Sequence, residues 1–330
     1  GFIGSALCRR LKAQGARVTC VDNLSYAACP QSVDALFNTN ACTLVREDIR
    51  NVDAIKTIIV ENKPDIIFHL AAESHVDRSI DDPKGFLSTN TQGTVAVLTG
   101  AQDYWKTLSD DSKSKFRFVH VSTDEVYGSL HEGEADENHA YRPNSPYSAS
   151  KAASDHFVRA WNVTYGLPTL MTHCSNNYGP YQYPEKLIPK TILRALDGKE
   201  IPVYGDGLNM REWIHVDDHV DALLVIAAKA QPGSRYNIGG GADGRITNID
   251  LVKKICAALD HLHPKGAPHN RLITFVADRP GHDLRYALDS RKIADDLGWS
   301  PKNNISTRIS DIVQWYIDHR QLWDNESAYR

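Results

Sequence analysis

The chain has 330 residues, of which 42% are hydrophobic and 24% charged, and its formal net charge is −4. This composition is typical of a globular protein with a large core, and the weak charge excludes a general attraction to nucleic acid or an anionic membrane. No run of 18 apolar residues predicts a membrane helix, and six scattered cysteines without a CxxC pair favour reduced thiols in the cytoplasm.

Strand-like and helix-like segments alternate along the first half of the chain. Amphipathic windows predict helices at 4–14, 51–62, 83–106 and 147–165, and short apolar runs predict strands at 16–21, 65–70, 116–121 and 169–172. This alternation predicts an α/β protein with a Rossmann-type doubly wound parallel sheet. Such sheets bind ligands beyond the carboxyl ends of their strands, where Asp22, Ala71–Ala72, Ser122–Thr123 and 174–176 are expected to follow the strands.

Proline and glycine become more frequent after residue 180, which predicts a smaller α/β C-terminal substrate domain. Helices are expected at 216–228, 248–260 and 305–320. We therefore predict a first domain of residues 1–180 plus about 214–236, and a second of 181–213 plus 237–330. The run Gly239–Gly241 is interpreted as a flexible turn, because no strand–glycine–helix unit surrounds it.

The segment Gly1–Gly4 heads the first helix and predicts a dinucleotide site. Glycine allows close approach of a pyrophosphate, and a helix N-terminus supplies N–H donors and a positive dipole end. Asp22 follows the next strand, where a carboxylate can accept from ribose hydroxyls and repel the 2′-phosphate of NADP. NAD is therefore the expected cofactor, although Asp22 could also be an ordinary turn residue. Asp48 and Ile49 end another short strand and could frame the adenine.

Tyr147 and Lys151 are four residues apart in a predicted helix and share one face. An ammonium group near a phenol favours the phenolate, so Tyr147 is expected to act as a general base. Thr123 could bind the same substrate hydroxyl. The neighbouring carboxyls of Asp124 and Glu125 would serve as acid and base if their surroundings separate their pKa values; the alternative is a solvated acidic turn.

Several further motifs accompany these residues. They are HLAAESHVDRSI at 69–80, Thr-Asp-Glu at 123–125, CSNNYGP at 174–180, PEKL at 184–187, PVYG at 202–205 and DRPGHDLRY at 278–286. Together with Gly1–Gly4 and the Tyr147/Lys151 pair, they resemble the extended short-chain dehydrogenases/reductases. Within that superfamily they resemble most specifically the family of dTDP-glucose 4,6-dehydratases, and the resemblance extends over essentially the whole chain.

The resemblance implies an NAD-dependent hydro-lyase that acts on dTDP-glucose. Tyr147 would deprotonate the C4 hydroxyl while NAD takes the C4 hydride, with Lys151 and Thr123 assisting. Glu125 would remove the C5 proton and Asp124 would protonate the departing C6 hydroxyl, before hydride returns to C6. The product would be dTDP-4-keto-6-deoxy-glucose, for deoxysugar biosynthesis of the rhamnose type.

The resemblance also implies two sets of binding residues. The cofactor set comprises Phe2, Ile3, Asp22, Asn23, Leu24, Ser25, Asp48, Ile49, Leu70, Ala71, Ala72, Ser74, Thr89, Tyr147, Lys151 and Asn177. The substrate set comprises Ser74, Thr123, Asn176, Lys186, Leu187, Pro202, Tyr204, Arg211, Asn248, Asp278, Arg279 and His282. Arg211 and Arg279 would hold the pyrophosphate, because a guanidinium binds phosphate with two parallel hydrogen bonds. The alternative for each arginine is an ordinary surface ion pair.

The sequence departs from the family pattern at its start, because the family has a strand and Gly-Gly-Ala ahead of this segment. We expect the chain to be a fragment of a longer polypeptide; weaker binding of NAD is the alternative. No metal site is expected, because no His, Asp and Glu cluster has ligand spacing. A homodimer through helices 83–106 and 147–165 is expected by analogy.

Other functions remain open at this point. A UDP-glucose 4,6-dehydratase would use the same chemistry with different base contacts. The Thr-Asp-Glu triplet argues against a UDP-sugar epimerase, which eliminates no water, and a decarboxylase would be expected to lack the aspartate. A non-catalytic NAD-binding protein need not retain all the catalytic residues together.

Overall fold

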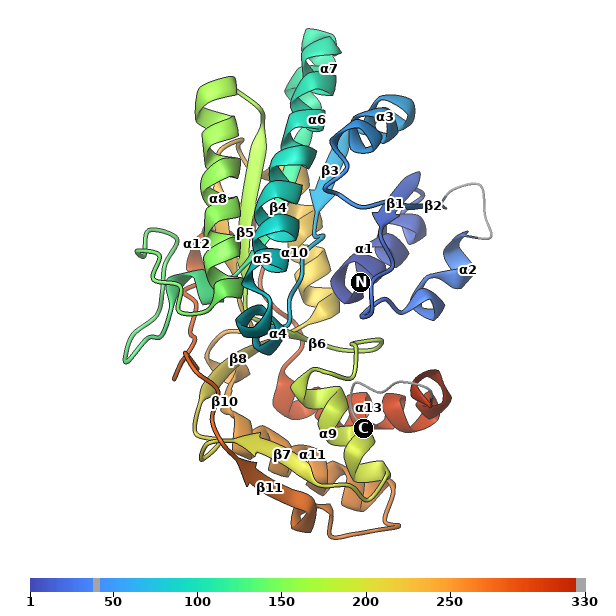
Figure 1. Cartoon of the computed structure of the whole chain (residues 1–330), viewed down its shortest axis with the longest axis vertical. Helices are drawn as coiled ribbons and strands as arrows, with labels where there is room; N and C mark the ends of the chain where they lie inside the picture. Colours follow the sequence, from blue (N-terminus) through green and yellow to red (C-terminus); the bar gives the residue numbers. More distant parts are fainter. Residues whose placement is uncertain (38–41, 325–330) are drawn as a thin grey trace.

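The computed structural model describes residues 1–37 and 42–324, and its centre is a parallel sheet (Figure 1). The strands β3 (Ile66–His69), β4 (Arg117–Thr123), β5 (Thr169–Cys174) and β9 (Arg235–Ile238) pair in that order, all parallel. A second parallel pair is formed by β1 (Val18–Asp22) and β2 (Cys42–Arg46). The predicted α/β class with a Rossmann-type parallel sheet is confirmed.

Helices cover both faces of this sheet because successive strand residues point to opposite sides. On one face, Phe118 packs with residues of α3 (Val52–Asn62), α6 (Gly93–Thr107) and α8 (Pro146–Tyr165). On the other, Val119 and Val121 pack with α10 (Val216–Lys229) and α12 (Arg291–Leu297). The first helix, α1 (Phe2–Ala13), packs against α10. This arrangement leaves the carboxyl ends of the strands as the place where side chains from several elements meet.

One predicted helix is not a regular α-helix throughout, and two predicted strands were ended too early. The expected helix at 83–106 is α5 (Pro83–Phe86), a π-helical segment (Leu87–Gln92) and α6 in succession. The strands β4 and β5 also continue further than expected, because Ser122 and Thr123 pair with His173 and Cys174. These polar residues are therefore the last residues of buried strands rather than the loops beyond them.

A second hydrophobic core lies in the C-terminal part, in the lower half of Figure 1. It is enclosed by α9 (Leu187–Leu196), α11 (Asn248–Leu262), α13 (Ile305–Asp318) and the parallel pair β7 (Ile201–Tyr204) and β11 (Ile273–Val276). The helices expected at 216–228, 248–260 and 305–320 are present. A three-stranded sheet of β10 (Arg245–Thr247), β8 (Met210–His215) and β6 (Asn176–Tyr178) accompanies it. The exact division into two domains stays a prediction.

Short elements complete the chain. They are α2 (Asp34–Phe37), α4 (Val76–Asp81), α7 (Asp110–Lys115) and the 3₁₀ turns Pro30–Ser32, Asp124–Tyr127, Ala242–Gly244, His269–Leu272 and Arg320–Trp323. In the described ranges, no helix has both the length and the apolar character needed to cross a membrane.

The turn Gly239–Gly241 is packed closely, although the sequence suggested flexibility. A Cβ atom at Gly240 would lie 1.9 Å from the carbonyl oxygen of Trp213, so only glycine fits there without a shift of backbone. The amide of Gly241 donates to the buried carboxylate of Glu212 at 3.2 Å. Close approach of backbone to β8 explains Gly240, and a left-handed φ of +74° explains Gly241.

Candidate active site

The carboxyl end of β4 and the first turns of α8 bring the predicted catalytic residues together. Pro146 and a reciprocal cap between Ser145 and Ser148 fix the start of α8, which places Tyr147 in its first turn. Lys151 follows one turn later and donates from Nζ to the carbonyl oxygen of Val121 on β4, at 2.8 Å. The side chains of Tyr147 and Lys151 are both buried.

Thr123 organises the turn that carries the two carboxyls. Its Oγ1 accepts from the amide of Glu125 at 3.3 Å, as the cap of the 3₁₀ turn, and donates to Asp124 Oδ1 at 3.2 Å. Burial raises the pKa of Tyr147, and a hydrogen bond with Thr123 acts in the opposite direction. Thr123 therefore connects the phenol to the acidic pair.

Asp124 has the properties of a protonated acid. Its side chain is buried and its Oδ2 has no partner among the described residues. Burial, followed by the charges of Glu125 and Glu212, raises the pKa of Asp124 well above the ordinary carboxyl range. An undissociated Asp124 can donate a proton to a leaving group.

Glu125 lies in a more cationic environment. Burial raises its pKa too, but the guanidinium groups of Arg279 and Arg211 act in the opposite direction. Asp124 is therefore buried and the neighbouring Glu125 half-buried, and Arg279 acts on Glu125 in particular. The alternative of a solvated acidic turn does not fit this burial.

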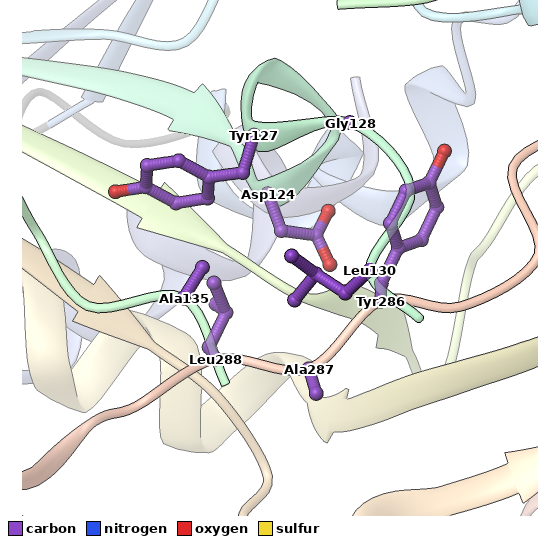
Figure 2. Close-up of a pocket in the computed structure, with 8 residues that line it drawn as sticks. All are labelled: Asp124, Tyr127, Gly128, Leu130, Ala135, Tyr286, Ala287 and Leu288. Carbon is purple, nitrogen blue, oxygen red and sulfur yellow. The ribbon is translucent and has the colours of Figure 1, made fainter. Parts of the chain in front are cut away.

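A narrow recess lies next to Asp124. Figure 2 shows the Asp124 carboxyl at the centre of this space, with the ring of Tyr127 directed away from it. The lining residues are Asp124, Tyr127, Gly128, Leu130, Ala135, Tyr286, Ala287 and Leu288. The mainly apolar wall explains why the charged form of Asp124 is disfavoured, and the space is too small for a nucleotide sugar.

The expected lowering of the Tyr147 pKa by Lys151 is not found in this structure. Burial, followed by the charge of Glu125, raises the pKa of Tyr147 well above the usual phenol value. Burial lowers the pKa of Lys151, while the charge of Asp155 acts to raise it. The desolvation of a phenol within the protein therefore outweighs the effect predicted from the helical spacing.

A groove adjoins the N-terminus of α1 and includes Asp22 and Leu24 in its lining. Asp22 Oδ1 accepts from the amide of Leu24 at 2.8 Å. A carboxylate beside the N–H groups of a helix N-terminus is the donor and acceptor set that an adenosine diphosphate needs. The residues of this groove therefore fit NAD.

The remaining cofactor candidates divide into two groups. Asn23 and Ser25 lie in the turn after β1, Leu70–Ala72 follow β3, Ser74 is exposed beyond them, and Thr89 lies in the π-helical segment. Phe2, Ile3, Asp48, Ile49 and Asn177 have side chains that are engaged elsewhere.

The engaged side chains have structural partners. Phe2 and Ile3 pack towards α10, so their backbone is the part directed to a ligand. Asp48 is paired with Arg50 at 2.7 Å, and hydrogen bonds from Arg50 lower its pKa to about 2. The Asn177 amide contacts His219 Nδ1 at 2.8 Å and donates to the Ser175 carbonyl at 3.0 Å. A cofactor contact through these side chains stays a prediction.

The predicted pyrophosphate ligands Arg211 and Arg279 both act on Glu125. Arg211 is 5% exposed, donates to the carbonyl oxygens of Met210 and Asp283, and lies 4.4 Å from the ring centroid of Tyr286. No carboxylate partner is recorded for it among the described residues. An ordinary surface ion pair is therefore not its role.

Arg279 is held by a residue that the sequence did not single out. Its Nη1 lies 3.2 Å from Asp77 Oδ1, and the hydroxyl of Tyr204 donates to Asp77 Oδ2 at 2.9 Å. The Nε of Arg279 is buried without a partner in the described structure. Asp77 thus binds two predicted substrate residues, Arg279 and Tyr204. Its position within the motif at 69–80 is the feature of the sequence that could have indicated this role.

Other substrate candidates lie around this cluster. Lys186 donates to the carbonyl oxygen of Ser74 at 2.8 Å, and His282 Nδ1 lies 2.6 Å from Asp278 Oδ1. Leu187 begins α9, Pro202 lies in β7, Asn248 begins α11, and Asn176 begins β6 with a buried, unpartnered Oδ1. Asp283 and Tyr286 were missed; they share a hydrogen bond of 2.6 Å beside Arg211.

Metal binding has no support in the described ranges, where no group of three or more His, Cys, Asp or Glu side chains is placed to hold an ion. The expectation that no metal is needed stays a prediction. The histidines near the sheet are engaged in buried hydrogen bonds instead.

Comparison with known proteins places the chain in a family. A family model described as GDP-mannose 4,6 dehydratase matches residues 1–312. The chain is 50% identical to a probable dTDP-glucose 4,6-dehydratase of Sinorhizobium fredii over 98% of this chain and 92% of that protein. It is 49% identical to a dTDP-glucose 4,6-dehydratase of Escherichia coli over 98% and 93%.

A solved structure is also similar to this chain over nearly its whole length. The dTDP-glucose 4,6-dehydratase DesIV of Streptomyces venezuelae, crystallised with NAD and TYD bound, has a TM-score of 0.89 to this chain at 41% identity. The match covers 98% of this chain and 96% of that one.

Proposed function

We propose, because the chain belongs to the GDP-mannose 4,6-dehydratase family, that it is an NAD-dependent dTDP-glucose 4,6-dehydratase. The relatives and the solved structure support the reaction, the cofactor and the substrate. The observation that carries the proposal is the acidic pair of the buried Asp124 and the half-buried Glu125, which follows Thr123 at the end of β4 and acts on Tyr147.

Asp22 and the N-terminus of α1 would hold the adenosine end of NAD, and Lys151 the nicotinamide ribose. Bound NAD supplies the chemistry of accepting a hydride from C4 of the sugar and returning it to C6. The reaction has no net redox change, so the overall result is the loss of one water.

The residues of the chain move the protons. Tyr147 takes the proton of the C4 hydroxyl, which Thr123 helps to orient. Because burial and the charge of Glu125 raise the pKa of this phenol, the step requires that the positive charges of bound NAD and Lys151 stabilise the phenolate. Once C4 is a ketone, the C5 proton is acidic, and Glu125 removes it. Asp124, which burial keeps protonated, donates its proton to the C6 hydroxyl as that group leaves as water. When hydride reaches C6, Glu125 returns a proton to C5, so the two carboxyls on successive residues would serve adjacent carbons of one sugar.

The substrate phosphates are assigned to two arginines. Arg211 and Arg279 offer forked donors close enough for their charges to act on Glu125, and Lys186 adds a third cation. Tyr204 and His282, whose rings contact edge to face at 6.2 Å between centroids, are assigned to the base. The product, dTDP-4-keto-6-deoxy-glucose, would enter deoxysugar biosynthesis.

The test is incubation of the protein with dTDP-glucose and, separately, UDP-glucose. Alkaline absorbance and the mass loss of one water report the 4-keto-6-deoxy product. We expect product from dTDP-glucose. Product from UDP-glucose at equal efficiency would retain the mechanism but reassign the base. Product from neither, with NAD bound, would refute the dehydratase and favour an epimerase or a non-catalytic protein.

The assembly and location are part of the proposal. A homodimer through α6 and α8 is supported by exposed apolar residues on α8, where Phe157, Val163 and Tyr165 are 40%, 65% and 48% exposed. A cytoplasmic location is supported by six free cysteines, none of which forms a disulfide. Sedimentation analysis at micromolar concentration tests the dimer, since a monomer would contradict it.

A further inference from the structure

A buried carboxylate beneath the active site has no part in the proton transfers described above. Asp155 lies on α8, one turn after Lys151, and is 1% exposed. Its Oδ1 lies 3.0 Å from His120 Nε2, and its Oδ2 accepts from Ser122 Oγ at 2.9 Å. The same Oδ2 accepts from the Tyr141 hydroxyl at 3.0 Å and lies 3.2 Å from His173 Nε2. A charge this deep is uncommon, and four polar contacts to it are specific.

Two of these contacts connect Asp155 to the strand segment that binds the Lys151 side chain. His120 and Ser122 lie on either side of Val121 in β4, and the carbonyl oxygen of Val121 is the acceptor for Lys151 Nζ. Asp155 therefore ties α8 to β4 immediately before and after the residue that orients the ammonium. The next residue of the strand is Thr123, which organises the acidic pair.

The charges around Lys151 also indicate that Asp155 stabilises its ammonium form. Burial lowers the pKa of Lys151, and the charge of Asp155 is the first of two that raise it, ahead of Cys174 on β5. His69 on β3 and His120 on β4 also face Lys151. Burial is the first cause that lowers their pKa values, which for His120 fall to about 4, so both rings are neutral near neutral pH.

The state of Asp155 is consistent with this role. Burial acts to raise its pKa, but hydrogen bonds from His120 and His173 outweigh burial, so the pKa lies far below the usual carboxyl range. Asp155 is therefore ionised throughout the working range of an enzyme.

We propose that Asp155 is a positioning residue for the dehydration: it fixes α8 against β4 on both sides of Val121 and is the buried counter-charge of Lys151. This inference rests on the proposed function. Asp155 touches neither the reacting atoms nor the surface, so its effect passes through Lys151.

The first test is Asp155→Asn, which removes the charge and retains the size. Lys151 would lose its proton at lower pH, so activity that needs the ammonium would disappear earlier as the pH rises. We expect the basic limb of the kcat profile to move down by about one pH unit, with KM for dTDP-glucose within about twofold. Asp155→Glu keeps the charge and should restore the limb. Bound NAD and the thermal midpoint are measured for each variant, so that loss of cofactor or fold is recognised.

A matched pair tests the geometry if Asp155→Asn does not fold. Ser122→Ala and Tyr141→Phe each remove one hydroxyl that donates to the same oxygen of Asp155, but only Ser122 belongs to β4. We expect Ser122→Ala to lower kcat at least about tenfold and Tyr141→Phe less than about twofold. Equal effects of the two variants would overturn the role of β4.

The outcomes separate this inference from the proposed function. A wild-type protein without activity on either nucleotide sugar refutes the function itself. An active wild type with an unchanged basic limb in Asp155→Asn refutes only the role of Asp155. A shifted limb, together with unequal effects of the matched pair, supports it.

Discussion

Replacing Asp124 by asparagine separates the acid of the elimination from the rest of the site. The amide retains an oxygen that accepts from Thr123, and the Asp124 Oδ2 that becomes NH₂ has no partner among the described residues. The structure therefore assigns almost no binding or packing cost to the change. What is lost is the proton donor, and general acid catalysis contributes about 100- to 10,000-fold, or about 3 to 5 kcal/mol in the barrier.

We expect kcat of Asp124→Asn to fall within that range while KM changes by less than about threefold. Oxidation at C4 does not need Asp124, so reduced nicotinamide should accumulate on the enzyme and be visible by its near-ultraviolet absorbance. Glu125→Gln is the matched comparison. It should abolish exchange of the C5 proton with D₂O, whereas Asp124→Asn should retain that exchange. A variant with nearly wild-type kcat would refute the assignment of Asp124 as the acid.

The same substitution has a consequence for stability. The raised pKa means that the folded protein keeps a proton that the unfolded chain releases above about pH 4. The contribution of Asp124 to stability is thus fully present at low pH and is lost as the pH rises above that value. Asp124→Asn should therefore be at least as stable as the wild type near neutral pH by thermal unfolding. A large drop in its midpoint would mean that the carboxyl is a structural partner.

Three further substitutions test the fold and the cofactor site. Asp218→Ala should lower the free energy of unfolding in urea by about 2–4 kcal/mol, because the buried Asp218 accepts two backbone N–H bonds from 302–303. The control is Asp221→Ala on the same helix, which should cost at most about 1 kcal/mol because Asp221 is a half-exposed partner of Arg10. Equal costs of the two variants would contradict the argument. Gly240→Ala should destabilise by at least about 1–3 kcal/mol, because its Cβ would meet a carbonyl oxygen of β8 at 1.9 Å; an unchanged thermal midpoint would refute this packing. Asp22→Asn should weaken the binding of NAD by about tenfold or more and reduce the ratio of the affinities for NAD and NADP, both measured by calorimetry. An unchanged ratio would show that Asp22 does not select the cofactor.

The sequence was sufficient where the signal is local. The spacing of Tyr147 and Lys151 and the apolar run before Thr123 predicted which side chains meet at the sheet edge. Strand ends were predicted too early, because Ser122 and Cys174 look like loop residues although they pair between buried strands. The sign of the pKa shift on Tyr147 was also wrong, since helical spacing does not reveal how deeply a phenol is buried.

Contacts between distant segments could not be predicted in this way. Asp77 lies 127 residues from Tyr204 and 202 from Arg279, and no periodicity connects them. In the sequence, Asp155 looks like an ordinary polar residue of an amphipathic helix, because its role depends on which strand residues the helix covers. Family motifs identified the segments in both regions, but the partners within them come only from the three-dimensional arrangement.

The two cores are joined by very short crossings. Only Ser175 separates β5 from β6, and β8 continues into α10 without an intervening residue. Arg211, at the start of β8, therefore belongs to the same continuous stretch of backbone as a helix that packs on the central sheet (Figure 1). Such crossings leave little length for a hinge between cofactor and sugar. Substrate capture would then depend on side chains and surface loops rather than on rotation of whole lobes, and heating should melt both cores in one cooperative transition.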